Sequence, residues 1–378
     1  QSLSKSFGFE EIKTPIIENL DLFKQNVGFE TDVSKEMFSW EDSSNNYLAL
    51  KPEMTAPVVR AFIESGFFRS KPLCKLFYID ALFRREKPQK GRQRQFHQFG
   101  VEAFGSSEIE QDIEVILIAT KVLCHLGIDN TVLQINNIGS KDTRMLYQDK
   151  LSKYFTSYKS KLSKISLKRL EINPLRILDS KEEIDLEIID GAPLITEFLS
   201  KDEHSKYLNL LSHLNALNIS YQENGRLVRG LDYYNSTTFE ISTLSSKSQN
   251  ALLGGGRYDY LVESMGGPAT PAVGFAAGIE RLMIESNFTI SKERVDFFIG
   301  YESQSKKIMS IANQLIDNGY NVFIDTLKKS EKSQIKSAIK LNAKYFLRIN
   351  DKIILKDLHS KKEFEVNSLN QIKDSIDK

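Results

Sequence analysis

Residues 83–102, FRREKPQKGRQRQFHQFGVE, decide the fold of this chain. Two runs rich in aromatic and apolar residues, LFYIDALFRRE and RQFHQFGVEAF, flank the polar loop KPQKGRQ, and this pattern predicts an antiparallel β-hairpin. Between Arg84 and Arg94, six cations stand against one acid, Glu86, although the formal net charge of the whole chain is only +1. The hairpin therefore predicts a local anion site, and two interpretations are open: a surface patch for nucleic acid or a pocket for a small polyanion.

The second strand of this hairpin has two chemically different faces, because side chains alternate along a strand. One face carries Arg94, Phe96, Gln98, Gly100 and Glu102. Gly100 removes a side chain between an amide and a carboxylate and leaves room for a ligand to approach the backbone. A solvated polar face is the simpler alternative, but such a row is costly to bury unless something pairs with its charges.

The composition is that of a globular protein and sets broad limits on its class. The chain has 378 residues, 40% of them hydrophobic and 27% charged, which is enough for two or three domains. No run approaches the ~20 apolar residues of a membrane span and no signal peptide opens the chain, so we expect a cytoplasmic protein with no membrane partner. Cys74 and Cys124 are too few for a disulfide framework, and we expect two buried thiols in a reducing compartment. Because the sequence starts at Gln1 without Met, we also expect a further segment upstream.

Two parts of the chain differ from the rest in their pattern. From about residue 140 to 222 glycine almost vanishes and apolar residues fall at helical spacing, as in YLNLLSHLNAL, which predicts an all-α insertion. From Val295 the runs read strand, helix, strand, helix, strand, strand, which predicts a small α/β domain with a mostly parallel sheet. Residues 301–378 hold 15 Lys and Arg against 10 Asp and Glu, so this domain carries positive charge suited to nucleic acid.

Several further stretches hold residue types suited to ligand binding: TPIIE (14–18), LKPEMTAP (50–57), LVRGLDYYNSTTFE (227–240), LLGGGRYDYLVE (252–263) and AVGFAAGIERL (272–282). Together with the hairpin, they occur in the order typical of histidyl-tRNA synthetases, and the chain resembles this family over nearly its whole length. The hairpin and the GIERL stretch resemble motifs two and three of class II synthetases. LVRGLDYY and GGGRYDYL resemble the two signatures particular to the histidine family.

The resemblance implies an α+β fold: a class II catalytic domain, whose antiparallel sheet is flanked by helices, with a helical insertion and a C-terminal α/β anticodon-binding domain. It places the first part of the catalytic domain, with motifs one and two, at residues 1–139 and the helical insertion at residues 140–222. The second part of the catalytic domain, with the histidine signatures and motif three, is expected at residues 223–292. The anticodon-binding domain is expected at residues 295–378. Motif one, which contains Pro15, is a dimer element in class II enzymes, so a homodimer is expected.

The family activates L-histidine with ATP, forming histidyl-adenylate and pyrophosphate, and then transfers histidine to the 3′ end of tRNA(His). The resemblance places Arg84 and Arg229 on the α-phosphate as catalytic residues, since a bidentate guanidinium stabilises a phosphoryl group that gains charge. It also places Arg281 on ATP, Arg92 near the outer phosphates and Glu86 near the adenine amino group. Mg²⁺ is expected with the polyphosphate, although the sequence does not identify its ligands.

Recognition of histidine depends on reading both nitrogens of the imidazole. The resemblance places Glu102 at one ring nitrogen and Tyr234 near the other, with Tyr258 alongside. The residues expected to receive the α-amino group are Glu53, Thr55 and Gln98. Simple packing beneath the glycine turn is the alternative role for Tyr258, and favourable placement at a helix start is the alternative for Glu53.

The chain departs from the family pattern at a few positions. Lys51 and Met54 replace the arginine and glycine of the commoner LRPEGT pattern, which makes the placement of the amino group less certain. Lys87 replaces an arginine of the motif-two loop, which keeps the charge but loses the fork geometry.

Transfer of the amino acid requires tRNA contacts in several regions. Gln89 and Lys90 lie at the tip of the motif-two loop, where the family meets the acceptor end of the tRNA. The insertion is expected on the acceptor stem and the C-terminal domain on the anticodon. The alternative is a non-catalytic paralogue such as the regulatory subunit of ATP phosphoribosyltransferase, which typically lacks the anticodon domain and departs from the signature that holds Arg229. This chain has both features.

Overall fold

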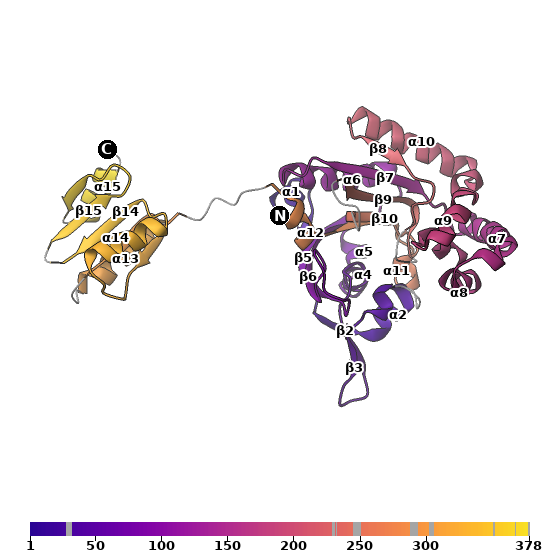
Figure 1. Cartoon of the computed structure of the whole chain (residues 1–378), viewed down its shortest axis with the longest axis horizontal. Coiled ribbons are helices and arrows are strands. Elements are labelled where there is room, and N and C mark those ends of the chain that lie inside the picture. The colour runs from indigo at the N-terminus through magenta and orange to yellow at the C-terminus, as the bar shows by residue number, and fades with distance from the viewer. Residues whose placement is uncertain are drawn as a thin grey trace. The chain divides into compact units, whose positions relative to one another are not determined.

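The computed structural model describes residues 1–27, 32–228, 231, 233–244, 251–287, 294–301, 306–350, 352–366 and 368–376. The chain forms two compact units, Gln1–Phe288 and Thr289–Lys378 (Figure 1), and each unit has its own central sheet. In these described ranges no helix is both long enough and apolar enough to cross a membrane.

An eight-stranded sheet forms the centre of the first unit, with the strand order β1-β5-β6-β11-β10-β9-β7-β8. Only the outermost pairs, β1 with β5 and β7 with β8, are parallel, and the remaining neighbours are antiparallel. The strands are β1 Glu10–Glu11, β5 Cys74–Phe83, β6 Gln95–Phe104, β7 Thr131–Asn137, β8 Tyr221–Glu223, β9 Asn235–Thr243, β10 Ala251–Arg257 and β11 Ala272–Gly278. This sheet and its helices confirm the class II architecture expected from the sequence.

The predicted hairpin is confirmed as strands β5 and β6. They pair antiparallel over their whole length, from Cys74 opposite Phe104 to Phe83 opposite Gln95. Beyond the strands, the backbone N–H of Arg84 donates to the carbonyl of Arg94 at 2.8 Å and extends the hairpin into its loop. The alternation expected along β6 therefore places Gln98, Gly100 and Glu102 on one face of the sheet.

Helices cover both faces of this sheet. Because successive side chains along a strand point to opposite faces, every second residue of a strand meets the same helices. On one face, α6 (Ile109–His125) and α10 (Lys201–Ala216) share a buried cluster with Val101 of β6 and Phe275 of β11. On the other face, α4 (Thr55–Glu64) packs Val58 and Phe62 against Tyr78. The residues expected to bind ligand lie on this second face, away from α6.

Short elements complete the catalytic part of the first unit. A small antiparallel sheet has the order β2-β4-β3. Its strands are β2 Ile17–Asn19, β3 Ser39–Glu41 and β4 Tyr47–Leu50. The short helices are α1 Ser2–Ser6, α2 Leu20–Val27, α3 Asp32–Lys35, α5 Phe67–Ser70, α11 Leu261–Ser264 and α12 Ile279–Glu285.

The segment between β7 and β8 is helical, and Figure 1 shows α7, α8 and α9 gathered beside one end of the sheet. Its elements are α7 Lys141–Ser157, η1 Lys159–Lys161, α8 Lys164–Ile172, η2 Pro174–Asp179, α9 Glu183–Asp190, η3 Ile195–Phe198 and α10. Glu203 of α10 ties the two ends together, because its carboxylate accepts from the backbone N–H of Ser140 at 2.6 Å and the hydroxyl of Thr143 at 2.8 Å. Burial alone would raise the pKa of Glu203, but these hydrogen bonds outweigh it and lower the pKa to about 2.

The second unit holds a five-stranded sheet with the order β13-β12-β14-β15-β16. Its strands are β12 Phe297–Gly300, β13 Val322–Ile324, β14 Tyr345–Ile349, β15 Ile353–Asp357 and β16 Glu363–Val366, and its helices are α13 Lys306–Asp317, α14 Glu331–Lys340 and α15 Leu369–Ile376. The predicted mostly parallel sheet is confirmed for β12, β13 and β14, which run parallel, whereas β15 pairs antiparallel with both β14 and β16. Since a parallel partner needs a long crossover, the short connection after Ile349 forces the antiparallel arrangement.

The two cysteines are free, as expected, but only one of them is buried. Cys74 begins β5 beneath α4, and burial raises the pKa of its thiol to about 11. Cys124 is exposed, so the prediction of a second buried thiol is wrong. It follows Leu123, which faces the sheet, and therefore falls on the solvent side of α6.

Candidate active site

The floor of the candidate site is a patch of sheet in which glycines make room for two large side chains, those of Tyr78 and Glu102. Two neighbouring rows cross the strands: Tyr78, Gly100, Ala276 and Gly254 form the first, and Leu76, Glu102, Gly274 and Gly256 form the second. A Cβ atom on Gly100 would lie 2.3 Å from the Tyr78 ring, and one on Gly274 would lie 1.9 Å from Oε2 of Glu102. The glycines are therefore required for these two side chains to lie flat on the sheet.

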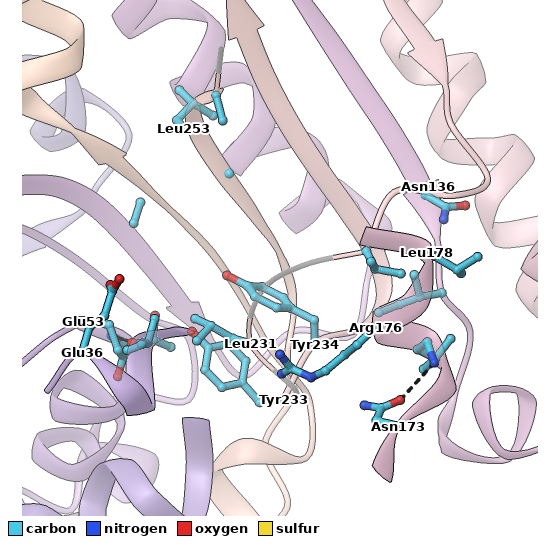
Figure 2. Close-up of a pocket in the computed structure, with 18 of the residues that line it drawn as sticks. Glu36, Glu53, Asn136, Asn173, Arg176, Leu178, Leu231, Tyr233, Tyr234 and Leu253 are labelled. Carbon is cyan, nitrogen blue, oxygen red and sulfur yellow. Dashed lines mark hydrogen bonds between the residues drawn. The ribbon is translucent and has the colours of Figure 1, made fainter. Parts of the chain in front are cut away.

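Above this floor is a cavity of about 1010 Å³ between the sheet and the helical segment. The expected site residues that line it are Glu53, Thr55, Arg84, Glu86, Arg92, Gln98, Tyr234 and Arg281. Figure 2 shows Glu53, Tyr233 and Tyr234 along the cavity, with Arg176 of η2 extending toward the two tyrosines. Residues far apart in the sequence thus meet in one place.

Glu53 lies in the turn between β4 and α4 and is almost fully buried. Its Oε2 accepts from the backbone N–H of Thr55 at 2.8 Å and its Oε1 from that of Ala56 at 2.9 Å, so it caps the first turn of α4. Burial raises the pKa of Glu53, and these hydrogen bonds oppose that rise. The carboxylate therefore occupies the favourable place at the helix start that was the alternative role, and it also lines the cavity.

The two departures from the LRPEGT pattern lie on either side of Glu53. Lys51 is fully buried, and its Nζ donates to Asp80 Oδ2 at 2.8 Å and to the carbonyl of Thr14 at 3.1 Å. Because Thr14 lies beside the motif-one proline and Asp80 lies on β5, Lys51 joins the motif-one segment to the hairpin. Met54 is buried and lines the cavity, and the Thr14 hydroxyl contacts its sulfur at 3.6 Å.

Glu102 lies just beneath the cavity and is surrounded by hydroxyl groups. Its Oε1 accepts from Thr55 at 2.9 Å and from Tyr78 at 3.4 Å, and its Oε2 accepts a short hydrogen bond from Tyr258. Burial, opposed by these donors and reinforced by nearby Glu53, raises the pKa of Glu102 to about 8. A carboxyl group with this pKa exchanges its proton near neutral pH, which suits a partner that is itself an imidazole.

Three tyrosines form the wall beside Glu102. The ring centroids of Tyr234 and Tyr258 lie 6.5 Å apart in an edge-on arrangement, and Tyr233 lies 4.7 Å from Tyr234 and 5.7 Å from Tyr258. The backbone carbonyl of Tyr234 accepts from Arg144 Nη1 of α7 at 2.6 Å. Tyr233 also lines the cavity, and its buried hydroxyl lies near Thr55.

Three guanidinium groups gather at a cationic end of the cavity, where Arg84 reaches the turn that holds Glu53. Arg84 donates from Nε to the carbonyl of Pro52 at 2.9 Å, and its Cζ lies 5.1 Å from the centre of the Phe96 ring. Arg281 of α12 donates from Nη1 to the carbonyl of Ala251 at 2.8 Å. Burial lowers the pKa of both Arg84 and Arg281, and the positive charge of Arg92 lowers both further. Three cations that disfavour one another in a partly buried space are arranged to receive a polyanion.

The loop between β5 and β6 folds back over this cationic end. Arg92 pairs with Glu86 at 2.9 Å, and the carbonyl of Gly91, a residue in the left-handed conformation, accepts from Arg281 Nε at 3.4 Å. Gln89 and Lys90 lie exposed at the tip of the turn, which the Gln89–Arg92 bridge closes. The loop thus carries one cation into the site and presents its tip to solvent.

The expected residues therefore divide into several groups. Two of them, Glu102 and Tyr258, are buried and lie outside the cavity lining, although Glu102 contacts Thr55 and Tyr78, which do line it. Arg229 lies outside the described residues. The sequence patterns did not single out Tyr78, Phe96 or Tyr233 as site residues. Two of them could have been found from their positions in the sequence: Phe96 shares a strand face with Gln98, and Tyr233 adjoins Tyr234.

Comparison with known proteins gives a consistent result. The family described as histidyl-tRNA synthetase matches residues 1–146 and 181–282. The chloroplastic histidine–tRNA ligase of Gracilaria tenuistipitata var. liui is 43% identical over 92% of this chain and 84% of its own length. The histidine–tRNA ligase of Dictyoglomus turgidum is 40% identical over 99% of this chain and 92% of its own length.

Solved structures agree with these sequence relatives. The apo histidyl-tRNA synthetase of S. aureus superimposes with a TM-score of 0.81 at 31% identity, covering 100% of this chain and 93% of that one. A structure from Bacillus halodurans, described as an ATP phosphoribosyltransferase regulatory subunit/histidyl-tRNA synthetase, has a TM-score of 0.65 at 21% identity over 92% of this chain and 91% of that one, which shows a common fold alone. The chain belongs to the histidyl-tRNA synthetase family.

Proposed function

We propose how this histidine–tRNA ligase, an ATP-dependent aminoacyl-tRNA synthetase, places its substrates. The observation that carries the proposal is one cavity lined by three arginines and, next to Arg84, by the carboxylate of Glu53. Arg84, Arg92 and Arg281 line the cationic end, where the polyphosphate of ATP would lie. Glu53 lines the adjoining turn, where the ammonium group of histidine would lie. The two reacting groups, the carboxylate of histidine and the α-phosphate of ATP, would then meet between them.

In the first step a carboxylate oxygen of histidine attacks the α-phosphorus of ATP. The bond from this phosphorus to its bridging oxygen breaks, pyrophosphate leaves, and histidyl-adenylate remains without a covalent bond to the enzyme. Arg84 would stabilise the charge that develops on the α-phosphate. Arg229 is assigned to the same phosphate from its place in LVRGLDYY alone. In the second step a hydroxyl of the terminal adenosine of tRNA(His) attacks the carbonyl carbon and AMP leaves.

Histidine recognition would combine groups from the cavity wall and the layer beneath it. Glu53, Thr55 and Gln98 offer oxygen atoms that an ammonium group requires. Tyr234 lines the cavity and would reach one ring nitrogen, with Tyr258 alongside. Glu102 would reach the other ring nitrogen when one of the hydroxyls that cover it, from Thr55, Tyr78 or Tyr258, turns toward the substrate.

The nucleotide base and the metal would be held differently. Phe96 presents a half-buried ring to the cavity beside Arg84, which suits stacking of a purine, and Glu86, which lines the same cavity, would accept from the amino group of the base. The described residues contain no group of three His, Cys, Asp or Glu side chains that could hold a metal ion. Mg²⁺ would enter with the phosphates of ATP and keep most of its water ligands.

The remaining contacts belong to the tRNA and to a second copy of the chain. Gln89 and Lys90 would meet the acceptor end of the tRNA. The helical segment at residues 140–222 would meet the acceptor stem, and the positively charged domain at 295–378 would meet the anticodon.

Motif one, at Pro15, would form the interface of a homodimer, and neighbouring Ile16 and Ile17 present exposed apolar side chains there. We place this enzyme in the cytoplasm, where tRNA is charged for protein synthesis.

Removal of residues 295–378 is expected to separate the two steps of the reaction. The apolar core of the second unit is separate from that of the first, so the shortened chain should retain its cavity. Histidine-dependent ATP–pyrophosphate exchange should stay within about threefold of the full chain, whereas charging of tRNA(His) should fall by about 100-fold or more. If charging survived unchanged, the assignment of this domain to the tRNA would be wrong.

A further inference from the structure

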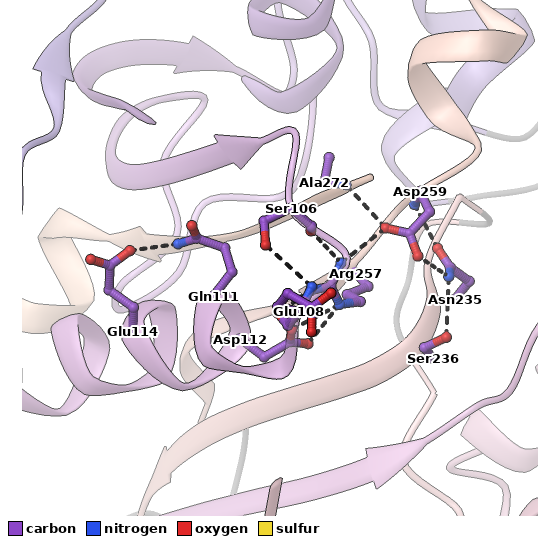
Figure 3. A network of polar contacts seen from close by, with 10 residues as sticks. All are labelled: Ser106, Glu108, Gln111, Asp112, Glu114, Asn235, Ser236, Arg257, Asp259 and Ala272. Carbon is purple, nitrogen blue, oxygen red and sulfur yellow. Dashed lines mark hydrogen bonds and ion pairs between the residues drawn. The ribbon is translucent and has the colours of Figure 1, made fainter. Parts of the chain in front are cut away.

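Behind the tyrosine wall lies a buried polar network that centres on Arg257 at the end of β10 (Figure 3). Its Nε donates to both carboxylate oxygens of Asp112, at 3.0 and 2.8 Å. Its Nη1 and Nη2 donate to the carbonyls of Ser106 and Glu108, at 3.0 and 2.9 Å. Burial alone would lower the pKa of Arg257, but the carboxylates of Asp112 and Asp259 outweigh it and raise the pKa. Arg257 is thus fixed as a cation to the first turn of α6.

Arg257 also holds Asp259, which forms a reciprocal pair with Asn235. Oδ1 of Asp259 accepts from Arg257 Nη1 at 3.2 Å and from the backbone N–H of Ala272 at 3.0 Å. Oδ2 of Asp259 accepts from Asn235 Nδ2 at 2.9 Å, and Oδ1 of Asn235 accepts from the backbone N–H of Asp259 at 2.7 Å. Two hydrogen bonds therefore join these residues, and Asn235 is almost fully buried.

The position of this pair in the chain connects it with the two tyrosines. Asn235 directly follows Tyr234, and Asp259 directly follows Tyr258. The pairing of β9 with β10 shifts register between Gly256 and Arg257, and Arg257, the last residue of β10, is then the partner of Asn235. On its other side the backbone N–H of Tyr258 donates to the carbonyl of Ala272 at 2.9 Å. The side chains of Asn235 and Asp259 add a link between β9 and the residues that follow β10.

We propose that Asn235 and Asp259, anchored through Arg257 to Asp112, are positioning residues that hold Tyr234 and Tyr258 at the angle needed to read the ring of the substrate. The described residues that line the cavity include none of these four, so they act through the tyrosines. This inference rests on the proposed function, which assigns Tyr234 and Tyr258 to the imidazole.

Two single variants and their combination test this inference. Asn235→Asp places a carboxylate against Asp259, and Asp259→Asn places one amide NH₂ group against another. Either variant should raise the KM for histidine in pyrophosphate exchange by about tenfold or more, with the KM for ATP changed by less than about threefold. The double variant exchanges the two side chains, so an acceptor again faces a donor and Arg257 again meets an oxygen. It should recover most of the lost affinity for histidine.

Asp185→Asn is a matched control, since Asp185 is a buried carboxylate in α9 that accepts from Ser163, Ser166 and Ser180, remote from the tyrosines. It should lower thermal stability without changing the KM for histidine. The inference would be overturned if the single variants left the KM for histidine unchanged. It would also be overturned if they raised the KM values for histidine and ATP equally and the double variant did not reverse the rise. A wild-type chain that shows no histidine-dependent exchange would instead overturn the proposed function, so the two failures are distinguishable.

Discussion

Arg84→Ala is expected to slow histidine-dependent ATP–pyrophosphate exchange by about 10³-fold, mainly through kcat. The guanidinium of Arg84 is oriented by the carbonyl of Pro52 and the Phe96 ring, and it lies at the cationic end of the cavity. A donor aimed at charge that develops only in the transition state contributes mainly to kcat. Arg84→Lys should recover a small part of the loss, because an ammonium keeps the charge but lacks the fork.

The neighbouring residue supplies a control for Arg84. Arg85→Ala removes the same charge one position along the chain, from an exposed side chain, and should leave exchange within about twofold of the wild type. Thermal unfolding of each variant separates lost chemistry from lost folding, since Arg84 also joins the end of β5 to the turn before α4. Similar small losses for Arg84→Ala and Arg85→Ala would remove Arg84 from the phosphate site.

The second large effect is expected from Glu102→Gln, which should raise the KM for histidine by about 100-fold and the KM for ATP much less. Three hydroxyl groups point at this carboxylate, and an amide NH₂ in place of one oxygen would leave at least one of them without an acceptor. The change also removes a carboxyl group that can exchange its proton with an imidazole ring. Equal losses for the two substrates would contradict a role in recognition of the ring.

Glu114→Gln is a suitable comparison for this variant. Glu114 pairs with Lys75 at 2.7 Å and lies on α6, on the far side of the sheet from the cavity. It should leave both KM values within about twofold of the wild type.

The pH dependence of unfolding provides a second test of Glu102. Because the folded state raises the pKa of this carboxyl from 4.5 to about 8, its contribution to stability is complete below pH 4.5 and is lost as the pH rises to about 8. The free energy of unfolding of the wild type should therefore fall relative to that of Glu102→Gln across this range. If the free energies of unfolding of the wild type and of Glu102→Gln differed by the same amount at every pH in this range, the buried carboxyl would not retain its proton.

Much of the fold and part of the site could be predicted from local patterns. Alternation along β6 was sufficient to place Gln98, Gly100 and Glu102 on one face, because a strand has only two. The separate α/β unit at the end of the chain followed from its alternating runs. The parallel direction of β12, β13 and β14 followed too, but the reversal at β15 did not, since pairing beyond Ile349 depends on the length of a connection and not on residue type.

Other features depend on contacts between distant segments, which local patterns do not encode. Lys51 could not be assigned from its neighbours, because its role comes from Thr14 and Asp80 on two other elements. Glu102 looks like a cavity residue in the sequence, yet Thr55, Tyr78 and Tyr258 cover it. The partners of Arg257 come from α6 and from the stretch beyond β10, so its network was invisible until the sheet was assembled.

The most direct test of the central claim is ATP–pyrophosphate exchange by the full chain with each of the twenty amino acids in turn. We expect exchange with histidine alone, because we propose that Glu53 receives the ammonium group and that Tyr234 and the buried Glu102 read the imidazole. Exchange supported equally by another amino acid would contradict the assignment of the site. Exchange with none would contradict the proposal that the cavity activates an amino acid.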